Sequence, residues 1–420
     1  MKTHFVKCKL FRPSRIKTSK HFGVNYQLKT VSKPAPLMVF LSLRKSVIFL
    51  RRNFSAFSTM KSVKLSPIIL NFNCKIYMCS DRDNFGFTFK NIKENLSKLN
   101  IAIDKDNVHT YHLKYATDDT ILFITHLFNS FIKHCFLPPR LLEGKIRPII
   151  KNKIGNFSDS NNYRPIMISS NFLKLFEYCI QPFLEQSLCL HNNQFGFRKQ
   201  TSTQMTVAVV KEVISNYNNN NSDVFAGFLD LNKGFDKVNH FKLLEFLWDT
   251  SLNSNLKLIM HKFLLNQSAY ISYNNLTSNV NHIGNGVRQG AINSPLLFNF
   301  YLSHMVKDIC SSKVGCKLGL SQFPLICYAD DLIALAPSQS ALQFLLNKMA
   351  SHLNKLSLSA NPSKTKIVVF SKGTSQKLNH VNLYLNGVRL DVVKSFKYLG
   401  VVLSSDSGHS LDIERLAEIF

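Results

Sequence analysis

Two adjacent carboxylates, Asp330 and Asp331, interrupt an otherwise apolar run from Leu325 to Leu335. Burying an ionised carboxylate without a partner is costly, and two neighbouring carboxylates also repel each other. A sequence that keeps both in a strand-like context therefore indicates a counter-charge, and hard oxygen ligands on a short turn suit Mg²⁺ or Mn²⁺. The alternative is that the pair forms the solvated tip of a β-hairpin, because Asp is a favoured turn residue.

A second apolar segment also ends in a carboxylate. Residues 225–231 predict a buried strand that carries Asp230 near its end, and Asp236 follows six positions later. Two strands that each bring a carboxylate to one end can hold two metal ions. In nucleotidyl transfer, one ion activates the attacking hydroxyl and the other stabilises the leaving pyrophosphate. We therefore expect Asp230, Asp330 and Asp331 to converge as a two-metal site.

The residues around these acids resemble the reverse transcriptases of non-LTR (LINE-type) retrotransposons. Gly227–His240 is similar to the first palm motif of that family, and Tyr328–Asp331 is similar to its catalytic hairpin. Further segments resemble the remaining motifs in the family's order: Asn162–Ile166 with Lys174–Glu177 in the fingers, Gln194–Arg198 with Ser202 and Thr203, Gly286–Phe298 at the nucleotide pocket, and Asn361–Thr365 and Phe396–Gly400 in the palm. The similarity extends from Phe85 to Arg415.

The resemblance implies roles for the carboxylates and for a neighbouring aromatic residue. Asp230 and Asp330 would ligate two Mg²⁺ or Mn²⁺ ions, and Asp331 would belong to the same metal site, chiefly as an electrostatic supporter. Phe235 would lie under the incoming sugar, where its ring occupies the volume that a 2′-hydroxyl needs and so favours deoxynucleotides. The alternative for Phe235 is an ordinary core aromatic, since this chain contains 34 Phe residues.

The same resemblance implies a set of nucleotide-binding residues. Lys151 and Arg164 match fingers positions that face the triphosphate, a role that suits the planar fork of Arg. Gln289 and Gly290 would shape the pocket floor, with glycine allowing close approach of the backbone to the nucleotide. Lys364 resembles a palm lysine that protonates the leaving pyrophosphate. The three cations could instead be solvated surface charges.

The expected fold class is α+β, a right-hand polymerase with fingers and palm. An antiparallel palm sheet would carry the acids on one face, and helices would cover the other. Apolar spacing predicts fingers and palm helices over residues 121–136, 171–190, 239–250 and 341–356, and a polar loop over 218–221. We expect a basic N-terminal segment over 1–84, then fingers and palm over 85–420. The thumb would be largely missing, because the chain stops at Phe420, shortly after 411–415, where a helical thumb would begin.

Three positions depart from the family pattern. Gly234 stands where alanine is usual, Gln200 where glycine is common, and residues 104–107 where the family has a glycine-containing turn. None of these changes removes a catalytic acid.

The charge balance indicates a polyanionic partner. Lys and Arg number 52 against 25 Asp and Glu, a formal net charge of +27. Binding to phosphates releases counterions, so it is strong and salt-dependent, as an RNA template paired with a DNA primer requires. Deoxynucleotides would be the small-molecule substrates. An A/T-rich coding sequence also enriches Lys, so mutational bias can account for part of this charge.

A membrane location and a zinc site are not expected. The apolar patch over residues 36–50 is broken by Arg44 and Lys45, so it is too short and too charged to span a bilayer. The nine cysteines form no Cys-x-x-Cys pair, and we expect reduced, buried thiols in an intracellular protein of the nucleus or cytoplasm.

Residues 1–80 contain no Asp or Glu, and three interpretations of them compete. They could be a mitochondrial presequence, a flexible nucleic-acid-binding arm, or non-native translated sequence with Met60 or Met78 as alternative starts. No motif series of an apurinic-type endonuclease occurs in residues 1–84.

Two functions follow from these observations. The first is an RNA-directed DNA polymerase, favoured by the intact carboxylates and the pocket motif. The second is a catalytically silent retroelement relic or a host-recruited nucleic-acid-binding protein, favoured by the expected lack of thumb and endonuclease. Metal-dependent primer extension distinguishes the two. Group II intron maturases and telomerases have a similar arrangement of palm motifs, but the residues of the motifs in this chain are more similar to those of the LINE-type enzymes.

Overall fold

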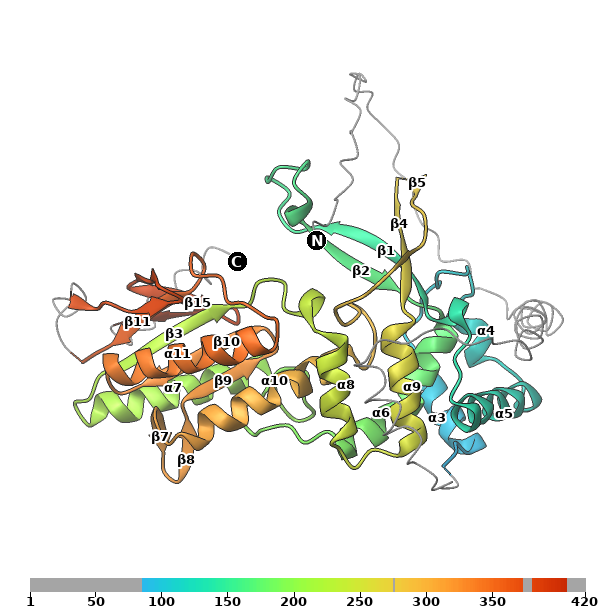
Figure 1. The fold of residues 1–420 in the computed structure, drawn as a ribbon, viewed down its shortest axis with the longest axis horizontal. Helices are drawn as coiled ribbons and strands as arrows, with labels where there is room; N and C mark the ends of the chain where they lie inside the picture. The colour runs from blue at the N-terminus through green and yellow to red at the C-terminus, as the bar shows by residue number, and fades with distance from the viewer. Residues whose placement is uncertain (1–84, 275, 373–379, 406–420) are drawn as a thin grey trace, which may run out of the picture.

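The computed structural model describes residues 85–274, 276–372 and 380–405, which form two regions side by side (Figure 1). We call the region built on the sheet β2-β1-β4-β5 the fingers, and the region built on the sheet β14-β11-β3-β10-β9 the palm. The expected N-terminal segment 1–84 and the expected start of a thumb at 411–415 lie outside the described residues.

Helices form the base of the fingers, and most begin at a side chain that accepts a backbone N–H. Ser170, for example, accepts from the N–H of Leu173 at 3.1 Å, which satisfies one of the free donors at the start of its helix. The helices predicted over 121–136 and 171–190 are confirmed, with ends displaced by a few residues. The fingers helices are α3 (Phe89–Lys98), α4 (Thr110–Lys114), α5 (Asp118–His134), α6 (Asn171–Ser187) and α9 (Ser254–Leu265).

The fingers sheet stands on these helices, and its strands reach away from them (Figure 1). β1 pairs antiparallel with β2 and parallel with β4, and β4 pairs antiparallel with β5 and β6. The strands are β1 (Glu143–Ile150), β2 (Tyr163–Ile168), β4 (Ser268–Tyr273), β5 (Leu276–Thr277) and β6 (Asn281–His282).

The palm sheet has β3 at its centre, paired antiparallel with β10 and β11. β9 continues the sheet beyond β10, also antiparallel. The expected antiparallel sheet is therefore correct except at one edge, where β14 pairs parallel with β11 because the chain passes through the hairpin β12–β13 before it returns. The strands are β3 (Val224–Asp230), β9 (Leu325–Tyr328), β10 (Asp331–Ala336), β11 (Lys366–Phe370) and β14 (Asp391–Val392).

Both faces of the palm sheet are buried. Along β3, Val224, Ala226 and Phe228 enter one hydrophobic cluster, whereas Leu229 enters the other. Successive side chains of a strand point to opposite faces, so this alternation places a cluster on each side. As register partners, Asp230 and Asp331 share one face, but they lie at the strand ends, and the sheet is covered on both faces and not only on the face opposite the acids.

Helices and a hairpin pack on the two faces of this sheet. The cluster with Phe228 includes residues of α7 and of the hairpin β15–β16, and the cluster with Leu229 includes residues of α10 and α11. The predicted palm helices 239–250 and 341–356 are confirmed as α8 and α11. The palm helices are α7 (Thr203–Asn219), α8 (His240–Trp248), α10 (Ser294–Ser311) and α11 (Gln339–Lys355).

Short elements complete the described chain. They are η2 (Pro139–Leu141), η3 (Ser160–Asn162), η4 (Phe235–Lys237), β7 (Cys316–Leu318), β8 (Ser321–Phe323), β12 (Tyr384–Leu385), β13 (Val388–Arg389), β15 (Ser395–Tyr398) and β16 (Val401–Ser404).

Two smaller expectations need correction. The loop predicted over 218–221 begins later, since α7 continues to Asn219 and buries Asn218; packing of the helix outweighs the low helix propensity of Asn there. Cysteines 179, 310, 316 and 327 are buried thiols, but Cys189 is exposed, just beyond the end of α6.

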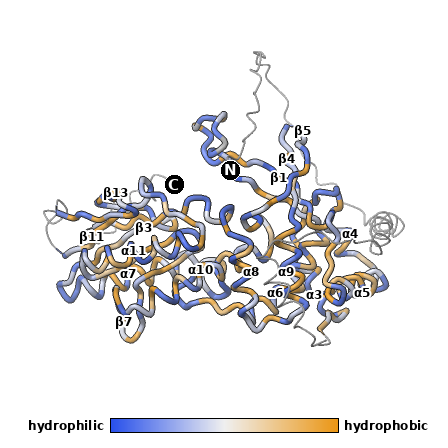
Figure 2. Tube along the Cα trace, viewed as in Figure 1, coloured by the Kyte–Doolittle hydropathy of each residue, from blue (hydrophilic) through white to orange (hydrophobic). Residues whose placement is uncertain are grey.

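Hydropathy follows this architecture. Figure 2 shows hydrophobic residues throughout the packed helices and palm strands, whereas the loop that joins β1 to β2 is hydrophilic. None of the helices in the described parts of the chain is long and apolar enough to cross a bilayer.

Candidate active site

The three predicted acids lie at one end of the palm sheet. Asp230 ends β3 and Asp331 begins β10, and these two residues are register partners on adjacent antiparallel strands. Asp330 occupies the turn between β9 and β10. The turn is tight because Ala329 adopts a left-handed backbone with φ of 54°, a conformation that costs an alanine about 1–2 kcal/mol. Sheet register therefore brings together carboxylates that are distant in sequence.

The charges of these acids raise the pKa of their neighbours. Burial raises the pKa of Asp331 to about 6, and the charges of Asp330 and Asp230 add to the rise. Burial also raises the pKa of Asp330, with a further contribution from Asp230, while Arg164 opposes it. Carboxylates that resist ionisation in this way favour a nearby cation.

Lys364 supplies one such cation from the protein itself. Its ammonium lies 3.4 Å from Oδ2 of Asp230, and its side chain is 65% exposed. The segment that carries it is fixed to β3, because the N–H of Asn361 donates to the carbonyl of Asp230 at 2.9 Å. The backbone is thus anchored while the Lys364 side chain can move in solvent.

The carboxylates fit a divalent ion in chemistry but are not gathered as a finished ligand set. Within residues 85–274, 276–372 and 380–405, no three His, Cys, Asp or Glu side chains lie close enough to hold a metal ion as they stand. The three acids nevertheless offer hard oxygen donors at a shared strand end, and an ion of charge +2 would relieve the repulsion that raises their pKa. Their convergence on metal ions stays a prediction.

The loop between β6 and α10, residues 284–293, lies against the turn that follows β3. The N–H of Val287 donates to the carbonyl of Phe235 at 2.8 Å, and Gln289 Nε2 donates to Asp236 Oδ1 at 2.7 Å. Phe235 is half-buried and stacks on Phe298 with ring centroids 4.4 Å apart and an interplanar angle of 14°. Phe235, Gln289 and the loop therefore form one assembly beside the acids.

Gly290 brings this loop into contact with the fingers sheet. Its φ of 110° is available only to glycine at low cost, and a Cβ there would lie 2.9 Å from the carbonyl oxygen of Met167 in β2. The N–H of Met167 also donates to the carbonyl of Gln289 at 2.8 Å. The pocket-floor position predicted for Gly290 thus coincides with a close approach of two backbones.

The two predicted fingers cations occupy different surroundings. Arg164 is exposed on β2 and acts electrostatically on Asp330. Lys151 is exposed just beyond β1, and its ammonium donates to the carbonyl of Asn161 across the β1–β2 loop at 2.9 Å. Arg164 therefore contributes to the electrostatic field at the acids, whereas the side-chain hydrogen bond of Lys151 lies within its own loop.

Comparison with known proteins identifies the family of the chain. The family model described as "Reverse transcriptase (RNA-dependent DNA polymerase)" matches residues 149–403. The chain belongs to the reverse transcriptase family. The predicted resemblance and the expected fold class are confirmed.

The curated relatives of this reverse transcriptase chain come from mobile elements. The "RNA-directed DNA polymerase from mobile element jockey" of Drosophila melanogaster is 25% identical over 346 residues, covering 79% of this chain and 37% of that protein. The "Retrovirus-related Pol polyprotein from type-1 retrotransposable element R2" of Popillia japonica is 26% identical over 280 residues, covering 63% and 39%. The chain thus spans less than two fifths of the length of these two relatives.

A solved structure also aligns with the chain. The apo telomerase from Candida Tropicalis, truncated from the C-terminal domain, has 14% sequence identity and a TM-score of 0.44, covering 70% of this chain and 60% of that one.

The segment Asn193–Phe197 packs against the turn between β9 and β10, which carries Asp330. The N–H of Phe195 donates to the carbonyl of Cys327 at 2.8 Å. A Cβ on Gly196 would lie 2.4 Å from the backbone nitrogen of Ala329, so no larger residue fits there without moving the turn. A segment remote in sequence therefore holds the turn that carries Asp330 in place.

Sequence reasoning missed several side chains of this support. Gln194 Nε2 donates to the carbonyl of Asn299 at 2.7 Å, and Asn299 Nδ2 donates to the carbonyl of Gly196 at 2.6 Å. Asp236 holds Gln289 instead of joining the other acids. The only signal in the sequence was proximity to a motif, since Gln194 begins the motif Gln194–Arg198 and Asn299 directly follows the motif Gly286–Phe298.

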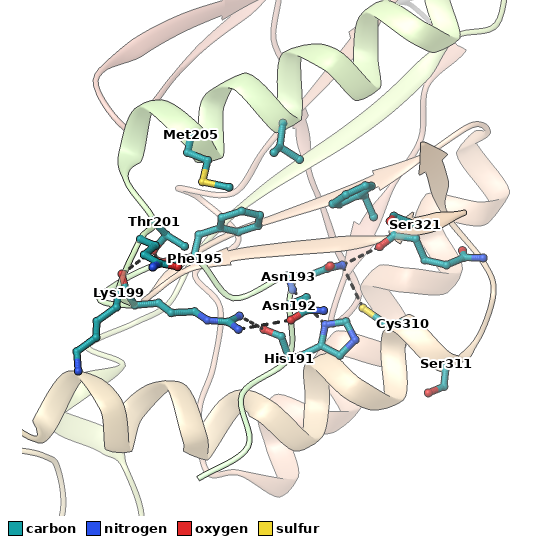
Figure 3. Close-up of a pocket in the computed structure, with 15 residues that line it drawn as sticks. His191, Asn192, Asn193, Phe195, Lys199, Thr201, Met205, Cys310, Ser311 and Ser321 are labelled. Atoms are coloured by element: carbon teal, nitrogen blue, oxygen red, sulfur yellow. Dashed lines mark hydrogen bonds between the residues drawn. The ribbon is translucent and has the colours of Figure 1, made fainter. Parts of the chain in front are cut away.

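A cavity of about 700 Å³ lies beside the same segment (Figure 3). It is lined by residues from the segment 191–201, the beginning of α7, the end of α10 and β8, and by no Asp or Glu. None of the predicted site residues lines it. This cavity is therefore separate from the carboxylates.

Proposed function

We propose that the chain carries the catalytic core of an RNA-directed DNA polymerase that extends a DNA primer on an RNA template with deoxynucleotides. The observation that carries this proposal is the register pairing of Asp230 with Asp331, with Asp330 in the adjoining turn, in a chain of the reverse transcriptase family.

Asp230, Asp330 and Asp331 would hold two Mg²⁺ or Mn²⁺ ions. When bound, such ions supply activation of the primer 3′-hydroxyl and stabilisation of the leaving pyrophosphate. Asp331 would act chiefly through its charge. Lys364, 3.4 Å from Asp230 and largely exposed, would donate a proton to the pyrophosphate.

The remaining predicted residues would bind the nucleotide. Phe235, fixed against Phe298, would bound the space beneath the sugar and disfavour a 2′-hydroxyl. Gln289 and Gly290 would form the pocket floor. Arg164 and Lys151 would meet the triphosphate, and for Lys151 this requires exchange of its bond to Asn161.

The formal net charge of +27 supports a nucleic-acid partner. Phosphate contacts release counterions, so affinity for a primer–template should fall steeply as salt rises. This property is shared by a polymerase and by a silent nucleic-acid-binding protein, so it does not distinguish them.

Primer extension tests the proposal. The unmodified chain should add deoxynucleotides to a DNA primer on an RNA template in Mg²⁺ or Mn²⁺, and Asp330→Ala and Asp331→Ala should each abolish addition. Asp391→Ala is the matched control, because Asp391 lies in the same sheet but is exposed and pairs with Lys366. Binding of RNA without any extension by the unmodified chain would reject the polymerase and favour the silent nucleic-acid-binding protein.

A further inference from the structure

The loop between β6 and α10 contains an arginine with almost no contact with solvent. Arg288 is 3% exposed and lies over the ring of Phe263 at 5.0 Å. Its Nε donates to Gln267 Oε1 at 2.9 Å, and its Nη2 donates to the carbonyl of Leu142. One loop side chain therefore joins the loop to Phe263 of α9, to Gln267 just after that helix, and to Leu142 before β1.

A carboxylate from α6 meets the same loop from the other direction. Glu177 is fully buried, and its Oε2 accepts from the N–H of Ile292 at 3.3 Å. Its backbone carbonyl accepts from Asn293 Nδ2 at 3.1 Å. Burial raises the pKa of Glu177 to about 7, while the charge of Arg288, the Ile292 N–H and the charge of Lys174 oppose the rise.

These groups are poor contributors to stability. Glu177 Oε1, Arg288 Nη1 and Asn293 Oδ1 are buried and have no hydrogen-bond partner among the described residues. A buried charged pair with unsatisfied atoms is often no more stable than hydrophobic residues of similar volume. The contacts of Arg288 and Glu177 instead hold the loop between Arg288 and Asn293 in a defined position.

That loop carries the nucleotide-pocket residues. Gln289 and Gly290 follow Arg288 directly, and Ile292, which donates to Glu177, lies two positions after Gly290. A shift of the loop at either contact would therefore move Gln289 relative to Asp236 and Gly290 relative to Met167.

We propose that Glu177 is a positioning residue for the incoming nucleotide: its buried carboxylate, opposite the Arg288 guanidinium, fixes the loop 286–293 and so sets the affinity for deoxynucleotides. The inference rests on the proposed function, because it assigns that loop to the nucleotide. Glu177 does not touch substrate. It acts through Ile292 and Arg288.

The proposal implies a dependence on pH with a definite sign. The charged groups that act on Glu177 are Arg288 from the loop and Lys174 from its own helix. Above pH 7 the carboxylate is ionised, so it attracts the Arg288 guanidinium through its charge and accepts strongly from the Ile292 N–H. Below pH 7 it is protonated, its hold on the loop weakens, and the KM for deoxynucleotides rises.

Single-nucleotide incorporation by Glu177→Gln is the first test. The amide mimics the protonated form, so the KM for deoxynucleotide at pH 8 should rise about tenfold while kcat changes less than about twofold. The unmodified chain should approach the KM of the variant as the pH falls to 6, and the variant should show no such pH dependence. Glu185→Gln is the control, because Glu185 lies on the same helix but pairs with exposed Lys199 at 2.6 Å.

Loss of folding would obscure that result, so a second variant is needed. Glu177→Gln leaves Arg288 buried without its counter-charge, whereas Glu177→Gln with Arg288→Met removes both charges and should fold. The double variant should retain the cooperative unfolding of the unmodified chain and still show the raised KM. A folded double variant with unchanged KM and unchanged pH profile would overturn the proposal.

Nucleotide binding without chemistry separates this inference from the proposed function. Equilibrium binding of a labelled deoxynucleotide can be measured on a primer–template whose primer ends in a dideoxynucleotide. If the unmodified chain binds nucleotide about tenfold more tightly than Glu177→Gln but never extends a normal primer, the polymerase proposal fails and the positioning role stands. Equal binding by the two chains, with normal extension, would reject the positioning role alone.

Discussion

In the palm sheet, alternate residues of β3 enter two buried clusters, whereas in the fingers sheet three apolar residues stay nearly half exposed: Ile149 is 49% exposed, Ile271 47% and Tyr273 44%. Both sheets contain strands of six to eight residues. They differ in their covers, because the palm sheet has helices or a hairpin on each face and the fingers sheet extends beyond its helices (Figure 1).

The difference shows how one chain combines a fixed part with an adaptable part. Carboxylates that repel each other need a backbone that cannot relax apart, and burial of both faces of the palm sheet provides it. The fingers sheet has few buried contacts near its tip, which is typical of regions with low local stability. We therefore expect the palm to resist perturbation as a unit and the fingers sheet to tolerate change.

The largest expected effect comes from truncating a palm strand. Ile333 of β10 is fully buried, so Ile333→Ala should lower the free energy of unfolding by about 3 kcal/mol. Ile271→Ala in the exposed fingers sheet should cost less than about 1 kcal/mol. Urea unfolding followed by circular dichroism gives both values. Equal losses at the two positions would remove the distinction between the sheets.

A smaller effect is expected in the connection between the two regions. Gln200, where the family commonly has glycine, is exposed and has a left-handed backbone with φ of 63°. Gln200→Gly should therefore raise the free energy of unfolding by about 1 kcal/mol, since glycine adopts this conformation without strain.

Gln200→Ala separates backbone strain from loss of the side chain. Alanine suffers the same strain as Gln, so the stability of this variant should stay near that of the unmodified chain. A gain in thermal midpoint for alanine equal to that for glycine would show that the backbone is not the cause.

The smallest expected effect concerns Asp331 in the absence of divalent ions. Its pKa in the folded chain is about 6, above the ordinary value of 3.8, so its ionisation as pH rises through 6 costs folding free energy. Asp331→Asn should therefore raise the thermal midpoint at pH 8, and the gain should vanish below pH 4. The effect should be small, because Asp331 is only partly desolvated and keeps enough exposed surface for solvent to screen its charge.

Scanning calorimetry in a chelating buffer at several pH values measures this change. Asp391→Asn is the control, since Asp391 is exposed in the same sheet and pairs with Lys366. A gain for Asp331→Asn that grows toward acid pH would contradict the assigned sign.

Local patterns predicted much of this architecture. Helical spacing of apolar residues located α5, α6, α8 and α11, and apolar runs ending in acids located β3 and the β9–β10 turn. The difference from the family pattern at Gln200 also has a structural consequence. The position where glycine is common has a positive φ in this chain. Such features depend on residues close together in sequence.

Contacts between distant segments could not be predicted in the same way. The parallel edge strand β14, the hydrogen bonds that join Asn299 to Gln194 and Gly196, and the buried charges of Glu177 and Arg288 all depend on which segments meet in space. A buried Arg in particular contradicts the usual expectation that charged residues lie in solvent. Only the tertiary structure shows where such charges are placed.

The strand order of the palm also determines when during synthesis the acids can meet. β3 is made early, but its neighbours β10 and β11 follow about 100 residues or more later, so loop closure over a long stretch must precede pairing of Asp230 with Asp331. A ribosome-bound chain that ends before β10 would hold an unpaired, apolar β3 and only one of the three acids. Release of a prematurely terminated chain should therefore yield an aggregation-prone fragment, never a partial polymerase.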